Sequence, residues 1–320
     1  MKDIGGTVAT TFRETFKLVN KETLRWFPGH MDKGLKQMGQ RLKNVDCIIE
    51  VHDARVPISG RQADFRHTLT GLKPHIFVLN KIDLADLKFK KQIVSHLQNE
   101  GLSNILFTNF KDSTCKGMKK ILPLAKKLIS NSERYNRSNE ESFAMMIIGI
   151  PNVGKSSLIN RLRNTHLKKA KATQEGPIAG VTRSVLTRIK ISENPNFFLL
   201  DTPGILAPHV NNINCGLKLA LIGCLQDHLV GYTTVADFLL FSLNKYQKYE
   251  YVEKLGLPEP NDDIVYILTF IAAKLGKTLK LRCNNEYIVK PDLEIAAKHF
   301  IAMFRKGEFG PICLDEDKFI

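Results

Sequence analysis

One run of eight residues limits the fold of this chain more than any other feature. Residues 149–156 read Gly-Ile-Pro-Asn-Val-Gly-Lys-Ser and match the pattern Gly-x4-Gly-Lys-Ser/Thr in full. The apolar residues before the run predict a strand, and the residues after it predict a helix. Backbone N–H groups in such a loop turn toward a phosphate at the start of the helix. The sequence therefore predicts a phosphate-binding loop in an α/β fold, with a chance match in a strand-to-helix turn as the alternative.

The positions of this loop have separate expected roles. Lys155 is expected to act in catalysis by neutralising the β- and γ-phosphate oxygens of a nucleotide, and the Ser156 hydroxyl is expected to bind Mg²⁺. The residues expected to bind phosphate are Asn152, Val153, Gly154, Lys155, Ser156 and Ser157.

A second motif, Asp201-Thr-Pro-Gly204, follows an apolar strand-like run and supplies further candidates. An acid at a strand end can hold Mg²⁺ through water, so Asp201 is expected at the metal site. The Gly204 N–H is expected to bind the γ-phosphate, which also makes Gly204 a catalytic candidate. Thr182, between the two motifs, is expected to complete the Mg²⁺ shell. Taken singly, Asp-Thr-Pro-Gly is an ordinary strand exit and a loop threonine is solvated, so both assignments depend on the phosphate loop.

Asn80-Lys81-Ile82-Asp83 follows the strand expected at 75–80 and is a candidate base-reading motif. A carboxylate can accept hydrogen bonds from both N1–H and the exocyclic amine of guanine, a donor pair that adenine lacks. Asp83 could instead cap a helix that begins at Leu84. We favour guanine binding by residues 80–83, with Thr108 and Asn109 at the next strand end contacting the base from the other side.

Strand-like and helix-like patterns alternate along the first two thirds of the chain, which predicts a doubly wound, mostly parallel sheet. We expect strands at 46–51, 75–80, 104–108, 144–149, 184–191 and 196–201, and helices at 31–43, 61–69, 87–98, 117–130 and 155–164. The polar residues 130–141 are expected to form a linker. After about residue 229 the pattern becomes mainly helical, which predicts a smaller C-terminal helical domain.

These boundaries divide the chain into three parts. Residues 1–24 form an N-terminal extension and a candidate targeting segment, with a frayed terminal helix as the alternative. Residues 25–228 form the nucleotide-binding domain, and residues 229–320 form the C-terminal domain. No apolar stretch is long enough to cross a membrane.

The charge of the chain favours anionic partners. The net charge is +15 and the pI is about 9.5, values that promote association with nucleic acid or anionic lipid. Six scattered cysteines form no Cys-x-x-Cys pair, so we expect reduced thiols rather than disulfides or a zinc site.

The order of the motifs resembles that of one known family. Ordinary small GTPases carry the phosphate loop first and Asn-Lys-x-Asp last, whereas here the base-reading motif comes first. Together with Trp26-Phe-Pro-Gly-His30-Met31, Val51-His-Asp-Ala-Arg55-Val-Pro and Gly216-Leu-Lys-Leu-Ala220, this order resembles the circularly permuted GTPases of the ribosome-biogenesis GTPase A (YlqF) family. The resemblance covers residues 25 to about 309 and is strongest to the mitochondrial members of the family.

This resemblance implies a function and a setting. It implies a Mg²⁺-dependent GTPase, slow alone and stimulated by ribosomal particles, that assists assembly of the large subunit of the mitochondrial ribosome and regulates mitochondrial translation. It further implies contact with the rRNA of that subunit, a monomer, and a location in the mitochondrial matrix with peripheral contact to the inner membrane.

The resemblance also implies two departures from ordinary GTPases. Ile205 follows Asp-Thr-Pro-Gly where many GTPases place a water-orienting glutamine, so His30 becomes the catalytic candidate, with a structural histidine in a Pro-Gly turn as the alternative. Asn152 resembles the asparagine that lets some members bind K⁺ near the phosphates. Three other functions stay open: a trafficking or signalling GTPase without RNA affinity, a P-loop ATPase or kinase, and a catalytically silent module that binds GTP.

Overall fold

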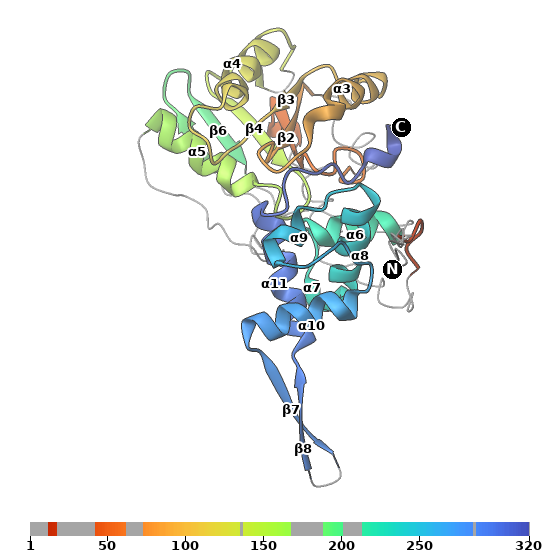
Figure 1. The fold of residues 1–320 in the computed structure, drawn as a ribbon. Helices are drawn as coiled ribbons and strands as arrows, with labels where there is room; N and C mark the ends of the chain where they lie inside the picture. Colours follow the sequence, from red (N-terminus) through yellow and green to blue (C-terminus); the bar gives the residue numbers. More distant parts are fainter. Residues whose placement is uncertain are drawn as a thin grey trace. The chain divides into compact units, whose positions relative to one another are not determined.

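A six-stranded sheet forms one of the two units into which the chain divides (Figure 1). The computed structural model describes residues 12–17, 42–61, 73–134, 137–167, 188–200, 213–283 and 286–319. The sheet unit comprises Leu24–Leu229 and Pro311–Ile320, and the second unit comprises Met1–Thr23 and Val230–Gly310.

The sheet has the strand order β3-β2-β1-β4-β6-β5. All neighbouring strands are parallel except β5 and β6, which are antiparallel. This arrangement confirms the expected doubly wound, mostly parallel fold. The strands are β1 (Cys47–Asp53), β2 (His75–Asn80), β3 (Ile105–Phe107), β4 (Phe143–Ile148), β5 (Arg188–Ser192) and β6 (Phe197–Leu200).

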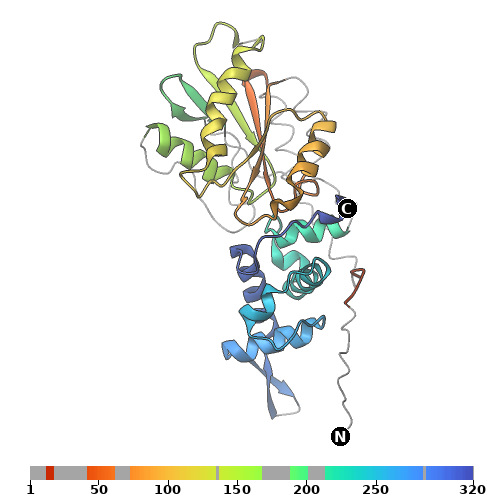
Figure 2. The same ribbon diagram turned by 45° about the horizontal axis from the view of Figure 1, so that its top comes forward.

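Helix α3 lies on the opposite side of this sheet from α4 and α5 (Figure 2). The central strands β1, β2 and β4 are continuous buried runs, which explains why they read as apolar rather than alternating. The described helices and 3₁₀ turns within this unit are η2 (Leu42–Asn44), η4 (Leu87–Phe89), α3 (Lys90–Asn99), α4 (Lys116–Ser130), α5 (Lys155–Leu167), α6 (Ile213–Leu221) and η6 (Glu316–Lys318). The helices expected at 31–43 and 61–69 fall almost wholly outside the described residues.

The segment expected to be a polar linker is bonded to a buried carboxylate. Asp46 is 1% exposed and accepts hydrogen bonds from Arg134 Nε at 3.2 Å and Arg137 Nε at 3.1 Å. The backbone N–H of Ala144 donates to the same carboxylate at 2.7 Å. Two arginines of this polar segment therefore fix the entry to β4 beside the start of β1.

The second unit contains four helices in the described residues and a hairpin that the sequence did not predict. Strands β7 (Thr278–Cys283) and β8 (Glu286–Pro291) pair antiparallel between two of the helices. The four helices are α8 (Tyr232–Lys245), α9 (Glu250–Leu255), α10 (Ile264–Leu275) and α11 (Leu293–Lys306). The short helix α7 (Asp227–Val230) spans the boundary between the units. Among the described residues, no helix is long and apolar enough to span a membrane.

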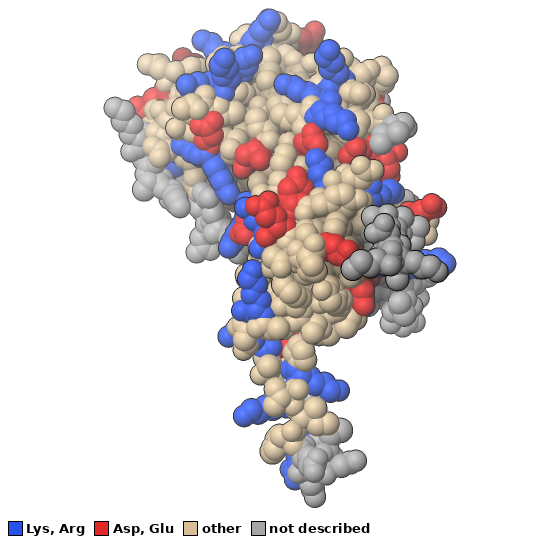
Figure 3. Space-filling view, in the orientation of Figure 1, with Lys and Arg blue, Asp and Glu red and all other residues tan. Residues whose placement is uncertain are grey.

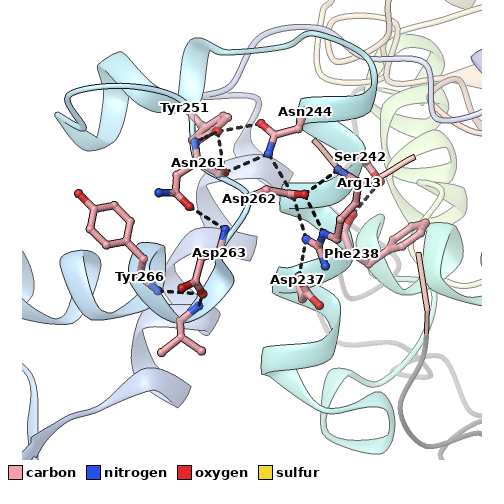
Figure 4. Close-up of polar contacts among 11 residues, drawn as sticks. Arg13, Asp237, Phe238, Ser242, Asn244, Tyr251, Asn261, Asp262, Asp263 and Tyr266 are labelled. Atoms are coloured by element: carbon pink, nitrogen blue, oxygen red, sulfur yellow. Dashed lines mark hydrogen bonds and ion pairs between the residues drawn. The ribbon is translucent and has the colours of Figure 1, made fainter. Parts of the chain in front are cut away.

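Residues 12–17 are tied into this second unit without forming a helix (Figure 4). Arg13 donates to Asp262 through its backbone N–H at 2.8 Å and its Nε at 2.9 Å, and to Asp237 through Nη2 at 2.8 Å. Phe16 packs edge-on against Phe238, with ring centroids 5.2 Å apart. This part of the N-terminal extension therefore belongs to the core and polar network of the second unit.

The C-terminal residues 311–319 pack on the sheet unit, whereas the sequence analysis assigned them to the C-terminal domain. The backbone N–H of Leu314 donates to the Arg55 carbonyl at 2.8 Å. Asp315, with no exposed surface, accepts hydrogen bonds from the Ser59 N–H at 2.7 Å and Lys218 Nζ at 3.2 Å. Buried polar bonding between distant residues, which no local pattern reveals, explains the difference.

The Arg13 network generates a stability prediction. Arg13→Ala should lower the free energy of unfolding of the second unit by about 1–2 kcal/mol, because two partly buried carboxylates lose charged hydrogen bonds. Urea unfolding of the full chain measures this change. Lys17→Ala, an exposed control in the same segment, should stay within about 0.5 kcal/mol of the wild type. Equal effects of the two substitutions would contradict a structural role for Arg13.

Candidate functional site

The phosphate-binding loop lies between the end of β4 and the start of α5. Gly149 has φ 144° and Gly154 has φ 106°, conformations that favour glycine. A Cβ at Gly149 would lie 2.2 Å from the Val51 carbonyl oxygen, and a Cβ at Gly154 would lie 2.5 Å from Asn80 Nδ2. Both glycines are therefore required by close approach of the loop to neighbouring strands as well as by backbone conformation.

The side chain of Lys155 is held inside the loop. Its Nζ donates to the carbonyl oxygens of Ile150 at 2.9 Å and Gly149 at 3.1 Å, and the residue is 7% exposed. Ser156 and Ser157 follow in the first turn of α5. This arrangement places a cation and a helix N-terminus together, which is the combination that binds phosphate.

Asn80 bonds the base-reading motif directly to the phosphate-binding loop. Its Nδ2 donates to the Val153 carbonyl at 2.8 Å, although the two residues are 73 positions apart. Its Oδ1 accepts from the Phe110 N–H at 3.1 Å, so both ends of the buried amide are used. Motifs predicted separately from the sequence thus form one continuous site.

Lys81 makes a second link between the same segments. The residue has φ 63°, and its Nζ donates to the Asn152 carbonyl at 2.6 Å. The same Nζ lies 3.0 Å from Oδ2 of Asp53, which has no exposed surface. Lys81 therefore joins the base-reading motif to the phosphate-binding loop.

Asp53, at the end of β1, was not anticipated as part of the site. Arg55 binds it through Nε at 2.9 Å and Nη2 at 2.8 Å. Burial alone would raise the pKa of Asp53, but the charges of Arg55 and Lys81 hold that pKa well below its ordinary value. Asp53 therefore stays ionised and fixes Lys81. The sequence pattern that could have predicted this role is an acid at the carboxyl end of an apolar strand, with an arginine two positions later.

The residues expected at the base differ in exposure. Asp83 is exposed, as a carboxylate that meets a ligand must be. Thr108 has no exposed surface. Its Oγ1 lies 3.4 Å from Asn80 Oδ1 and 3.4 Å from the Leu79 carbonyl oxygen. Asn109 Oδ1 accepts from the Lys111 N–H at 3.0 Å. The Thr108 side chain thus contacts Asn80, and its contact with a base stays a prediction. Ile82 donates its N–H to the Thr108 carbonyl at 3.2 Å.

Four predicted site residues lie outside the described residues: His30, Thr182, Asp201 and Gly204. Of the oxygen donors expected for Mg²⁺, only Ser156 is in the described part, at the N-terminal turn of α5. The described residues that fit a nucleotide are therefore those of the phosphate-binding loop and the base-reading motif, Asn152–Ser157 and Asn80–Asp83.

The contact at Gly154 generates a binding prediction. Gly154→Ala should weaken GDP binding by about tenfold to a hundredfold, because a Cβ strains the loop and displaces Asn80. Gly231→Ala is a matched control, since Gly231 has φ 91° but its Cβ would meet nothing closer than 3.5 Å. Fluorescence titration with a labelled GDP measures both affinities. Wild-type affinity in Gly154→Ala would show that the close approach is unimportant.

The chain is similar in sequence to proteins named as GTPases. Residues 144–268 match the family model described as 50S ribosome-binding GTPase. The chain is 53% identical over 316 residues to Mitochondrial GTPase 1 of Aedes aegypti, covering 98% of this chain and 100% of that protein. It is 49% identical over 321 residues to Mitochondrial ribosome-associated GTPase 1 of Bos taurus, covering 99% and 96%.

A bacterial relative and a solved structure extend the comparison. Ribosome biogenesis GTPase A of Priestia megaterium is 34% identical over 260 residues, covering 79% of this chain and 85% of that protein. The crystal structure of GNP-bound YlqF from T. maritima has a TM-score of 0.54 at 23% identity, covering 87% of this chain and 95% of that chain. Its similarity shows the fold. The chain therefore belongs to the family of circularly permuted GTPases that includes Mitochondrial GTPase 1 and Ribosome biogenesis GTPase A.

Proposed function

We propose that this GTPase is an assembly factor for the large subunit of the mitochondrial ribosome and thereby regulates mitochondrial translation. The observation that carries the nucleotide part is the hydrogen bond from Asn80 to the Val153 carbonyl, which joins the base-reading motif to the phosphate-binding loop. Support for the ribosomal part comes from the names of the mitochondrial and bacterial relatives and from the net charge of +15.

The described residues perform the binding part of the mechanism. The loop N–H groups and the N-terminus of α5 hold the phosphates, and Lys155 neutralises oxygens of the β- and γ-phosphates. Asp83 accepts the guanine N1–H and exocyclic amine, which excludes adenine. GTPases of this kind use Mg²⁺, which when bound offsets phosphate charge. Ser156 would hold it from the start of α5, and we assign Thr182 and Asp201 to the same ion.

Water activation is assigned to residues outside the described parts. His30 is the candidate to orient the attacking water, since Ile205 cannot, and the Gly204 N–H would bind the γ-phosphate. Asn152 is the candidate for K⁺ binding. Its backbone has φ 59°, and its Nδ2 donates to the Gly223 carbonyl at 2.6 Å, so its orientation is fixed beside the loop.

The names of the same relatives support a mitochondrial setting, and the finer details of the setting are part of the proposal. We assign the protein to the mitochondrial matrix as a monomer that contacts large-subunit rRNA, with peripheral association on the matrix side of the inner membrane. A trafficking or signalling GTPase is the second candidate, and it would show no RNA affinity.

Exchange of the base-reading carboxylate tests the nucleotide part. Asp83→Asn should lower GTP affinity by about a hundredfold, because an amide cannot accept both guanine donors. The same substitution should raise XTP affinity, since the amide N–H can donate to the xanthine 2-oxygen. Asp86→Asn is the matched control and should leave the nucleotide affinities unchanged. Asp86 is a nearby carboxylate that caps η4 by accepting from the Lys88 N–H at 3.0 Å. Competition against labelled GDP by GTP, XTP and ATP measures these changes, and a preference for ATP in the wild type would refute guanine specificity.

Phosphate release with ribosomal particles tests the assembly part. The protein alone should turn over at about 10⁻³ per second, and mitochondrial large-subunit particles should accelerate it at least about tenfold, since they would act as the missing activator. Small-subunit particles and the Lys155→Ala variant are the controls, and Na⁺ in place of K⁺ should slow the reaction if Asn152 holds K⁺. Absence of both cosedimentation and stimulation by large-subunit particles would favour the trafficking or signalling alternative.

A further inference from the structure

The β7–β8 hairpin extends from the second unit on a fixed base (Figure 1). Helix α10 ends at Leu275, and Gly276 follows it in the left-handed conformation with φ 63°. Asp292 starts α11 directly after β8 by accepting from the Ile295 N–H at 3.0 Å, and its own N–H donates to the Lys277 carbonyl at 3.1 Å. The hairpin therefore leaves two packed helices without a linker, which fixes its direction relative to them.

The described side chains of the hairpin are exposed on both of its faces. Tyr287 is 70% exposed and Val289 is 57% exposed on one face, while Leu279 and Ile288 on the other face are 45% and 43% exposed. A two-stranded hairpin is marginally stable by itself, and an exposed apolar patch marks an interaction surface. The hairpin thus has the properties of a surface that a partner covers.

The strand register sorts the charged residues onto one face. Arg282 pairs with Tyr287, and Lys280 pairs with Val289, so these four side chains share a face. Residues two apart on a strand are about 7 Å apart, so the two cations form a row beside the aromatic ring. On the opposite face the described side chains are Leu279, Ile288 and Lys290, of which Lys290 is the one cation. We call the first of these surfaces, formed by Lys280, Arg282, Tyr287 and Val289, the basic–aromatic face.

The charge of the hairpin is complementary to a polyanion. Between residues 277 and 291 the chain has four basic residues, Lys277, Lys280, Arg282 and Lys290, and one acid, Glu286. Figure 3 shows Lys and Arg side chains along the hairpin, separated by uncharged ones. Cations that neutralise phosphates beside an aromatic ring that can stack on an unpaired base are the groups that recognise single-stranded RNA.

We propose that the basic–aromatic face of the β7–β8 hairpin binds an unpaired segment of RNA, with Tyr287 stacked on a base and Lys280 and Arg282 on the flanking phosphates. This inference rests on the proposed ribosomal function and names the surface that would contact the RNA. A hairpin that bound a lipid surface would instead insert Leu279 and Ile288 of the opposite face. Its cations would contact lipid headgroups, and Tyr287 would not be required for binding.

Fluorescence anisotropy of the full-length protein with a labelled RNA stem-loop tests the proposal, with a blunt RNA duplex of equal length as the second probe. Tyr287→Ala should weaken stem-loop binding by about fivefold to a hundredfold and leave duplex binding nearly unchanged, whereas Tyr287→Phe should keep wild-type affinity. Lys280→Ala with Arg282→Ala should reduce the slope of log affinity against log salt by about 1.4. Lys126→Ala with Lys127→Ala on α4 removes the same charge elsewhere and should leave the slope unchanged.

The remaining measurements separate this inference from the proposed function. Every variant should bind labelled GDP and unfold like the wild type. If wild-type protein cosediments with mitochondrial large-subunit particles and the Tyr287 and Lys280/Arg282 variants bind the stem-loop equally well, the hairpin inference fails while the ribosomal function stands. If the wild type binds neither probe nor the particles, the ribosomal function itself fails. The last probe is a vesicle of phosphatidylcholine and cardiolipin. If the Lys280/Arg282 variant loses binding to these vesicles but still binds the stem-loop like the wild type, the RNA assignment is overturned in favour of a membrane contact.

Discussion

The hydrogen bond from the Asn80 amide to the Val153 carbonyl is the contact on which the nucleotide site depends. The base-reading motif and the phosphate-binding loop are far apart in the sequence, because Asn80 and Val153 are separated by 73 positions. Contacts between side chains and backbone therefore have to bring the two motifs together. Strand β1 lies between β2 and β4 and aligns their carboxyl ends. Asn80 and Lys81 then cross from one strand end to the other loop, while Asp53 fixes Lys81. Permutation of the chain is tolerated because side chains and sheet register, rather than backbone order, define the pocket.

Three buried carboxylates hold the parts of the sheet unit that have little regular structure. Asp46 binds the segment before β4, Asp53 binds the turn after β2, and Asp315 binds the C-terminal residues to the loop after β1. Each is paired with at least one Arg or Lys, which offsets the cost of burying its charge. Burial alone would lower the pKa of Lys218, but the charges of Asp315 and Asp317 raise it above its ordinary value. Part of the basic excess of this chain is therefore structural.

The sheet and the two nucleotide motifs could be predicted because strands and motifs of this kind are recognisable from consecutive residues. The continuous apolar run at residues 75–80 and the glycine-lysine run at 149–156 each carry their own signal. The role of Arg13 could not be predicted, because its partner Asp262 is 249 positions away. The contact of Thr108 with Asn80 could not be predicted either, because the burial of Thr108 depends on packing. The hairpin was missed because its strands are short and their Leu-Lys-Leu-Arg alternation occurs within a helical region. His30, Thr182, Asp201 and Gly204 stay predictions.

The return of residues 311–319 to the sheet unit has a consequence for how this protein can be cut. The chain passes from one unit to the other near residues 23, 229 and 310, so residues 230–310 of the helical unit are inserted within the sequence of the sheet unit. A stop codon after residue 229 would also delete Asp315 and leave the buried ammonium of Lys218 without its acids. A sheet unit suitable for isolation would instead need residue 229 joined to residue 311 through a short designed bridge.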